Sequence, residues 1–198
     1  TGRCWSRMSA AALIEAAAAG ALPPWAEAGP SRRAHMGRVA ALMDAWAAGL
    51  GLDARERMRW RAAAWLHDVL RDADPARLRA SLGGGHAEWP SGLLHGPAAA
   101  ARLAEEGVTD QPLLNAVAWH TLGHPDLDLL GRCLYVADYI EPGRTYEPGL
   151  LAVLRARMPA AAADVVREVA RRRISRLLES GRPIAAETAA FWNSVAGG

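Results

Sequence analysis

Histidine and aspartate residues occur in five apolar segments that lie far apart in the sequence. The segments read AHMGRV, WLHDVL, LLHGPA, VAWHTL and YVADYI, and their ionisable residues of interest are His35, His67, Asp68, His95, His120 and Asp138. A buried ionisable side chain is costly unless it is paired or bound to a metal. One such residue alone would be an ordinary core histidine or a solvent-facing acid. Five segments with the same feature predict that these side chains converge on a metal ion.

The types of ligand indicate which ion this site would take. Imidazole and carboxylate without thiolate favour a catalytic transition ion such as iron, manganese, cobalt or nickel, and argue against a closed structural zinc site built on cysteine. The neighbours His67 and Asp68 would point about 100° apart on an ideal helix. They can meet at one ion if the ion lies off the end of the helix, because histidine reaches further than aspartate.

The pattern of caps, glycines and apolar spacing predicts helices almost throughout the chain. In the first half of the chain we expect a helix at 9–20 capped by Ser9, a proline-rich connector at 21–30, a helix capped by Ser31 and running to about Leu50, a helix at 54–73 capped by Asp53, a helix after Asp74 and Pro75, and a loop at 81–92. In the second half we expect helices at 95–106, after Asp110 and at 127–138, a loop at 140–149, a helix from Pro159 to about Gly181, and a short last helix. We find no β-alternation, internal repeat or domain linker. The prediction is an all-α fold in which residues 1–198 form a single helical domain, with residues 1–30 as N-terminal helix and connector.

Composition limits the class of protein. The chain has 198 residues, 51% hydrophobic and 22% charged, which is typical of a soluble protein with a substantial core. The longest apolar runs are alanine-rich and shorter than the roughly 18 residues that a membrane span needs. No basic-then-apolar targeting signal is visible, and Cys4 and Cys133 lie far apart, which suits a reducing compartment. We therefore expect a cytoplasmic protein that does not associate with membranes.

Charge gives little support to nucleic-acid binding. The net charge is only +2, and every basic residue is an arginine. The arginine-rich stretches RERMRWR and VREVARRR are therefore interpreted as solvated helix faces rather than contacts to a phosphate backbone. His86, in a glycine-rich loop, is expected to be solvent-exposed, Trp119 to be pocket wall or core, and Cys133 to be a small core residue.

Longer motifs show a resemblance to a known family. The order His, His-Asp and distant Asp, together with LLHGP, WHTLGHP and YVADYIEPGR, resembles the HD-domain metal phosphohydrolases. Within them it is similar to the YqeK family of bacterial symmetrical diadenosine tetraphosphate hydrolases. The resemblance runs from about Arg32 to the C-terminal helix, and WHTLGHP and VADYIEPGR are far more specific than the His-Asp pair.

The resemblance implies an HD-domain helical bundle with an iron site between its central helices. The positions that match the family's metal ligands are His35, His67, Asp68 and Asp138. His95 and His120 match positions that either bind a second ion or touch the phosphates of the nucleotide, and the sequence does not separate these cases. With a second ion, Asp68 would be the bridging carboxylate, and two ions about 3.5–4 Å apart would share a hydroxide.

The resemblance also implies residues that contact the substrate. Arg71 stands where the family usually has lysine, four residues after His67, and is expected on the same helix face. Arg144 matches the family's phosphate-contacting arginine, and Arg182 and Ile184 lie in GRPIAAET, which matches its nucleotide-contacting loop. His124 stands where the family usually has arginine, so a phosphate contact there would weaken.

The implied reaction is cleavage of diadenosine tetraphosphate in the middle to give two ADP. Asp68, Arg71, His95 and His120 are the expected catalytic residues, and His95 or His120 could protonate the leaving oxygen if it is not metal-bound. Two alternatives stay open: an HD phosphohydrolase for another nucleotide or phosphate ester, and an HD module that binds nucleotide or RNA without turnover. The complete ligand set favours an enzyme, and a homodimer supported by exposed tryptophans is left open.

Overall fold

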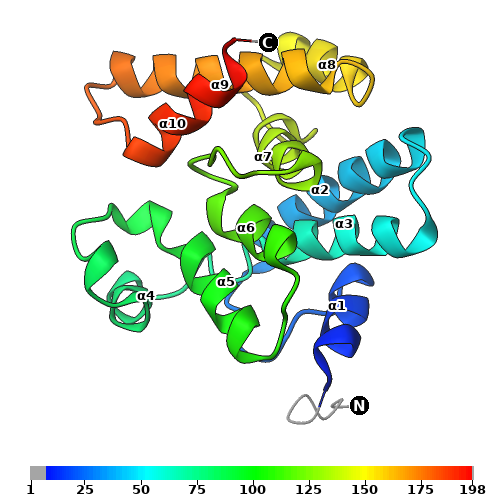
Figure 1. Ribbon diagram of the computed structural model, residues 1–198, viewed down its shortest axis with the longest axis vertical. Helices are drawn as coiled ribbons and strands as arrows, with labels where there is room; N and C mark the ends of the chain where they lie inside the picture. Colours follow the sequence, from blue (N-terminus) through cyan, green and yellow to red (C-terminus); the bar gives the residue numbers. More distant parts are fainter. Residues whose placement is uncertain (1–7, 198) are drawn as a thin grey trace.

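A computed structural model describes residues 8–197 of the chain, and this part is entirely helical (Figure 1). The prediction of an all-α fold is therefore confirmed for the described residues. The α-helices are α1 (Ala10–Ala18), α2 (Pro30–Gly49), α3 (Ala54–Leu66), α4 (Pro75–Leu82), α5 (His95–Glu105), α6 (Gln111–Trp119), α7 (Leu129–Ile140), α8 (Pro148–Arg157), α9 (Ala162–Glu179) and α10 (Ala186–Val195), and two 3₁₀ turns lie at Gly84–His86 and Ser91–Leu93.

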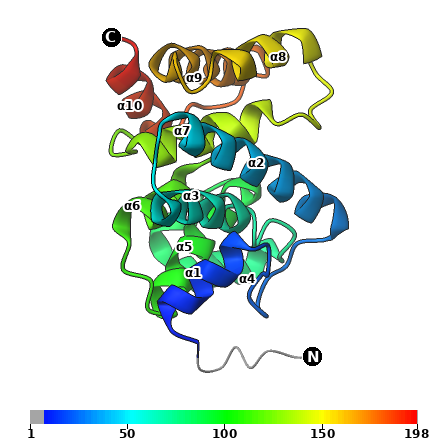
Figure 2. The same ribbon diagram turned by 90° about the vertical axis from the view of Figure 1, so that its right-hand side faces the viewer.

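The helices pack in two groups that meet at α7. Helices α8, α9 and α10 form one end of the molecule, and α1, α4 and α5 form the other, so the first and last described helices lie at opposite ends (Figures 1 and 2). Between them, α2 packs along α3, α6 packs against α5 and α7, and α7 also contacts α2 and α9. The middle of the molecule is therefore surrounded by α2, α3, α5, α6 and α7.

Side-chain caps explain where several helices begin. Ser9, Asp53 and Asp110 each accept a hydrogen bond from the backbone N–H three residues later, as the sequence predicts. Asp128 caps α7 in the same way. The prediction that Ser31 caps α2 is wrong: the cap position is Gly29, no side chain caps the helix, and α2 begins at Pro30, because proline already has the backbone angle of a first helical residue.

The core is built from large side chains at helix contacts and from alanines that allow helices to approach closely. Trp60, Tyr135 and Phe191 are among the largest fully buried side chains, and Cys133 is buried as predicted. A Cβ on Gly96 would lie 2.6 Å from the carbonyl oxygen of Ala118. Glycine at this position therefore permits the close crossing of α5 over α6.

Helix α3 ends earlier than the sequence suggested, and the prediction of a helix to residue 73 is wrong. α3 stops at Leu66, and the following N–H groups of Val69 and Arg71 bond three residues back. Glu27 also exchanges backbone hydrogen bonds with this segment, donating to the Val69 carbonyl and accepting from Asp72. These long-range hydrogen bonds occupy backbone groups of Val69 and Asp72 that a continued helix would bond internally. Tertiary contacts therefore override the local helical pattern.

Helix α8 was not predicted, because the interval 140–149 was interpreted as loop and no helix was expected before Pro159. Its cap residue Glu147 has a left-handed backbone (φ 43°) and no side-chain cap bond. The usual polar signal of a helix start is therefore missing. Pro148 at the first helical position is the one local sign that could have been used.

Three expectations about the surface have clear outcomes. None of the described tryptophans is exposed, so exposed tryptophans no longer support a homodimer. Trp5 and Cys4 lie outside the described residues. His86 is half-buried against Trp89 rather than solvent-exposed. Among the described helices, none combines the length and the apolar character that crossing a membrane requires.

The arginines of α3 and α9 are mostly engaged with acids. Arg57 and Arg61 pair with Asp44, and Arg171 and Arg172 pair with Glu168. These pairs agree with the interpretation of the arginine-rich stretches as ordinary helix faces, except at Arg173, which bonds the carboxylate of Asp138.

The close contact at Gly96 gives a first prediction. Gly96→Ala should lower the free energy of unfolding by about 1–3 kcal/mol, because the added methyl group overpacks the crossing of α5 and α6. Gly92→Ala is the control, since a Cβ there meets nothing within 4 Å; it should leave stability almost unchanged. Urea denaturation followed by circular dichroism measures both. Equal stability of Gly96→Ala and wild type would contradict the packing account.

The ion pair between Arg59 on α3 and Asp110 at the start of α6 gives a second prediction. Burial opposes ionisation of Asp110, but the Arg59 guanidinium and the Leu113 N–H outweigh it and lower the pKa below its ordinary value of 3.8. The pair therefore stabilises the fold above about pH 3.8 and loses this effect as pH falls through the lowered pKa. Asp110→Asn should be destabilised by at most about 1 kcal/mol at pH 7, and the gap should shrink in unfolding measurements below pH 3.8. A gap that widens towards acid pH would contradict this sign.

Candidate metal centre

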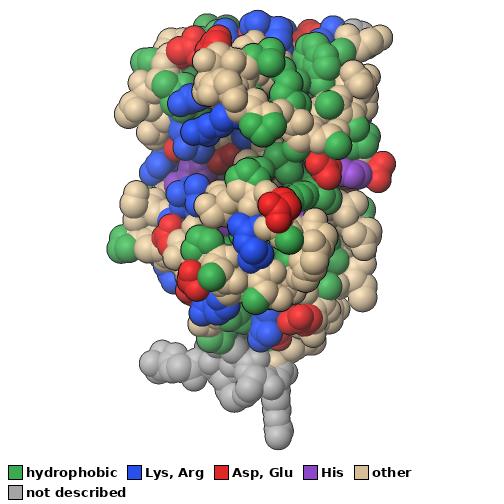
Figure 3. Space-filling model, turned by 90° about the vertical axis from the view of Figure 1, so that its left-hand side faces the viewer, with side chains coloured by type: hydrophobic (Ala, Val, Ile, Leu, Met, Phe, Trp, Pro, Cys, Tyr) green, Lys and Arg blue, Asp and Glu red, His purple; other side chains and the backbone are tan. Residues whose placement is uncertain are grey.

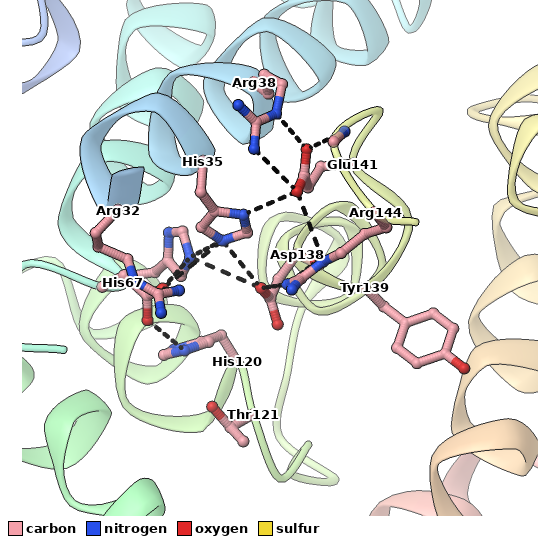
Figure 4. A network of polar contacts seen from close by, with 12 residues as sticks. Arg32, His35, Arg38, His67, His120, Thr121, Asp138, Tyr139, Glu141 and Arg144 are labelled. Atoms are coloured by element: carbon pink, nitrogen blue, oxygen red, sulfur yellow. Dashed lines mark hydrogen bonds and ion pairs between the residues drawn. The ribbon is translucent and has the colours of Figure 1, made fainter. Parts of the chain in front are cut away.

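Five helices direct imidazoles and carboxylates to one place in the middle of the molecule. His35 lies inside α2, His67 and Asp68 follow the end of α3, His95 is the first residue of α5, His120 follows α6, and Asp138 lies in the last turn of α7. All are buried or nearly so, with exposed fractions of 5% or less for His35, His67, Asp68, His95 and His120. Figure 4 shows His35, His67, His120 and Asp138 pointing towards one another.

The first group of atoms has the spacing of metal ligands. The Nε2 atom of His35 lies 3.3 Å from Nε2 of His67, 3.2 Å from Oδ1 of Asp138 and 3.6 Å from Oδ2 of Asp68. Nε2 of His67 lies 3.5 Å from the same Asp68 oxygen. Ligand atoms about 2.1 Å from an ion are roughly 3.0–3.4 Å apart in octahedral or tetrahedral geometry. The donor set and its spacing therefore fit a divalent transition ion.

A second group lies on the other side of Asp68. Oδ1 of Asp68 is 3.0 Å from Nε2 of His95 and 3.5 Å from Nε2 of His120, and these two nitrogens are 3.1 Å apart. The two oxygens of one carboxylate thus face two different clusters. This is the arrangement of a bridging carboxylate, and it supports the two-ion alternative that the sequence left open.

Helix ends fix the orientation of two of the imidazoles. The Nδ1 atoms of His67 and His120 lie 2.6 and 2.8 Å from the carbonyl oxygens of Ala64 and Val117, each three residues earlier. The last carbonyls of a helix lack a backbone partner, so each ring donates its Nδ1 proton there. In the neutral rings the unprotonated Nε2 then faces the cluster, as a metal ligand requires.

Electrostatics keep the acids ionised and His120 neutral. Burial lowers the pKa of His120 to about 4, and the neighbouring His67 and His95 act in the same direction. Burial opposes ionisation of Asp68 and Asp138, but His67, His120 and His95 around Asp68, and His35 and Arg173 around Asp138, hold both pKa values well below the usual range. At pH 7 the site therefore offers carboxylates and at least one neutral imidazole.

Arginines surround the carboxylates. Arg32 donates to Oδ2 of Asp68 at 2.6 Å, Arg144 to Oδ1 of Asp138 at 2.8 Å, and Arg173 to Oδ2 of Asp138 at 2.9 Å. A cavity of about 280 Å³ opens beside them, lined among others by Arg32, Arg38, Arg144 and Tyr146. Figure 3 shows histidine side chains in a recess with basic side chains around it. Guanidinium groups in such a recess suit phosphate oxygens.

The structure brings together the six residues expected at the metal site, and Arg144 beside them; their roles as ligands stay predictions. It does not bring Arg71 onto the same helix face as His67, since α3 has ended at Leu66. Among the described residues, Arg71 makes no side-chain hydrogen bond or ion pair. Arg182 and Ile184 lie in the exposed connection between α9 and α10 and make no polar side-chain contact within the described chain. The imidazole of His124 stacks on the indole of Trp119, with 4.9 Å between the ring centroids.

Four residues at the site were missed: Arg32, Arg38, Glu141 and Arg173. Arg32 lies one turn before His35, and Glu141 lies three residues after Asp138 within the motif YVADYIEPGR, so helical spacing from a predicted ligand would have found both. Arg173 was discounted as part of a solvated face. Within VREVARRR, Arg173 is the arginine whose side chain turns inward. Its Cζ lies 4.4 Å from the centroid of the Tyr135 ring.

The described fold is all-helical, and histidine and aspartate side chains from five helices lie around one carboxylate, where they could hold a metal ion. The model of the HD-domain family matches residues 32–143, which is more than half of the chain. The chain belongs to the HD-domain family.

Known proteins with similar sequence or fold agree with this assignment. A symmetrical bis(5'-nucleosyl)-tetraphosphatase of Halalkalibacterium halodurans is 34% identical over 104 residues, covering 52% of this chain and 54% of the relative. Proteins of the same name from Staphylococcus aureus and Bacillus subtilis are 35% identical over 91 residues and 46% identical over 59, covering 43% and 29% of this chain and 46% and 31% of the relative. The chain thus spans about half the length, or less, of the curated relatives it matches. A predicted HD superfamily hydrolase from Clostridium acetobutylicum, described as involved in NAD metabolism, has a similar fold with a TM-score of 0.76 and 25% identity, covering 85% of this chain and 90% of that one.

The ligand spacing gives a third prediction. Adding Mn²⁺ or Fe²⁺ to chelator-treated protein should raise the thermal midpoint, because an ion that binds only the folded state stabilises it by about 2.7 kcal/mol at one hundred times its dissociation constant. Asp68→Asn should lose most of this shift, since it removes charge from both clusters. Differential scanning fluorimetry measures both. A midpoint unchanged by every divalent ion tested would contradict the site.

Proposed function

We propose that this protein is a metal-dependent phosphohydrolase that cleaves diadenosine tetraphosphate symmetrically to two ADP. The observation that carries the proposal is the carboxylate of Asp68, whose two oxygens face two clusters of imidazoles beside an arginine-lined cavity. The names of the curated relatives support this substrate. The resemblance in the motifs WHTLGHP and YVADYIEPGR supports the same reaction.

The two ions would share Asp68 and differ in their other ligands. His35, His67, Asp68 and Asp138 would hold one ion, and Asp68, His95 and His120 would hold a second. Ions bound in such sites lower the pKa of a coordinated water and polarise phosphoryl oxygens. Imidazole and carboxylate without thiolate suit iron, manganese, cobalt or nickel, and we propose iron because the family that the motifs resemble uses it.

The remaining residues bind and orient the substrate. Arg32, Arg38 and Arg144 line the cavity next to the carboxylates, so their guanidinium groups can neutralise phosphate oxygens on one side of the scissile bond. Arg173 holds Asp138 from the other side and donates to the carbonyl of Thr121. Arg71, Arg182 and Ile184 stay predicted substrate contacts that only mutagenesis can assign.

The proposal extends to the whole chain and its setting. Arg173 lies on α9, beyond the residues that match the family model, yet it bonds Asp138. This contact supports the proposal that residues 1–198 work as a single domain. A cytoplasmic location is proposed from the low number of cysteines, and Cys133 is buried and unpaired.

Another phosphate substrate is the runner-up, because the arginines would accept any phosphate of suitable length. The related hydrolase described as involved in NAD metabolism makes a nicotinamide dinucleotide a necessary member of the substrate panel. A binding module without turnover is less well supported, since the ligand positions are all occupied by suitable residues and Arg171 and Arg172 of α9 are paired with Glu168.

The fourth prediction concerns the products. Iron- or manganese-loaded protein incubated with diadenosine tetraphosphate should give ADP as the sole nucleotide product, measured by ion-exchange chromatography. Asp68→Ala should lower kcat by at least roughly 100-fold, in line with the loss of a metal ligand. Asp44→Asn removes a carboxylate from the same helix as His35 but away from the cluster, and should keep wild-type activity. ATP plus AMP as products, or turnover of the nicotinamide dinucleotide alone, would refute the proposal.

A further inference from the structure

We infer that Glu141 is a positioning residue for the metal ligand His35, and that Arg38 and Gly143 hold Glu141 in place. The inference rests on the metal centre of the proposed function and concerns how one of its ligands is oriented. It does not depend on which phosphate compound is cleaved.

His35 needs a partner that His67 and His120 find in their own helices. His67 and His120 follow helix ends, where free carbonyls accept their Nδ1 protons. His35 lies inside α2, where the carbonyls are already bonded within the helix. Its Nδ1 instead lies 3.2 Å from Oε1 of Glu141. A side chain more than a hundred residues away therefore sets the tautomer and the ring orientation of His35.

Glu141 is itself fixed from several sides. Its carboxylate is only 2% exposed. Arg38 donates from Nε to Oε2 at 2.5 Å and from Nη2 to Oε1 at 3.3 Å, and the N–H of Gly143 donates to Oε2 at 2.6 Å. Figure 4 shows this chain of contacts from Arg38 through Glu141 to His35. With both oxygens bonded, the carboxylate has little freedom to leave the imidazole.

The backbone after Glu141 leaves space for the Arg38 guanidinium. A Cβ on Gly143 would lie 2.5 Å from both Cζ and Nε of Arg38. Any other residue at 143 would therefore push the guanidinium away from Glu141. This observation is independent of the hydrogen bonds and indicates that Arg38 and the segment 141–143 are matched in shape.

The same contacts distinguish this group from a surface ion pair. Asp44 also accepts from two arginines, but it touches none of the candidate ligands. Glu141 lies directly behind a ligand, and an anionic carboxylate on Nδ1 makes the opposite nitrogen a stronger donor to a metal. The group should therefore act on metal affinity and not only on folding.

The test compares Mn²⁺ binding by isothermal titration calorimetry in chelator-treated protein. Glu141→Gln keeps the shape but removes the charge, and should weaken binding at the site that contains His35 by roughly 10- to 100-fold. Arg38→Lys and Gly143→Ala alter the support of Glu141 without changing Glu141 or a candidate ligand, and should weaken Mn²⁺ binding by a smaller factor. Asp44→Asn is the matched control and should bind as wild type does. Circular dichroism of the ion-free proteins shows whether each variant is folded.

Each outcome decides the inference. If folded Glu141→Gln binds Mn²⁺ within about twofold of wild type, or if Asp44→Asn is weakened equally, Glu141 has no positioning role. If Glu141→Gln does not fold, wild-type affinity in both Arg38→Lys and Gly143→Ala overturns the inference. A wild-type protein that binds no ion overturns it together with the metal centre. If Mn²⁺ affinity falls from wild type through Arg38→Lys and Gly143→Ala to Glu141→Gln, but the wild-type protein has no tetraphosphatase activity, the inference stands and only the proposed function is refuted.

Discussion

The carboxylate of Asp68 lies between two groups of imidazoles in the interior, and the arrangement of the central helices follows from it. Removing a carboxylate from water costs several kcal/mol unless opposite charge or hydrogen-bond donors replace the water. Here His35 and His67 lie near one oxygen and His95 and His120 near the other, with Arg32 as an additional donor. The four imidazoles come from four different elements, so α2, α3, α5 and α6 must all end or pass at this point.

The way the helices end makes this convergence possible. Adjacent residues on a continuous helix would point His67 and Asp68 in different directions. His67 keeps a helical backbone at the end of α3, and Asp68 lies in the turn that follows, so both side chains face the same centre. The free carbonyls at the ends of α3 and α6 then orient His67 and His120. The close crossing at Gly96 brings His95 to His120, so the backbone supplies most of the positioning.

Much of this could be predicted from the sequence, for identifiable reasons. Ser9, Asp53 and Asp110 are strong local cap signals, and the buried histidines and acids stand out against apolar neighbours, so helices and candidate ligands were recognisable. The end of α3 was not, because it depends on backbone bonds between Glu27 and the segment that follows Leu66. Helix α8 lacked a capping side chain. Arg173 was hidden among surface arginines of the same helix, and only the fold shows that it turns towards Asp138.

The most direct measurement of the central claim is anomalous diffraction from crystals of manganese- or iron-loaded protein. We expect two anomalous peaks, one on either side of the Asp68 carboxylate. One should lie roughly 2.0–2.3 Å from ligand atoms of His35, His67, Asp68 and Asp138, and the other at a similar distance from those of Asp68, His95 and His120. Anomalous peaks only elsewhere on the protein, or none at all in fully loaded crystals, would contradict the idea that these side chains form a metal centre.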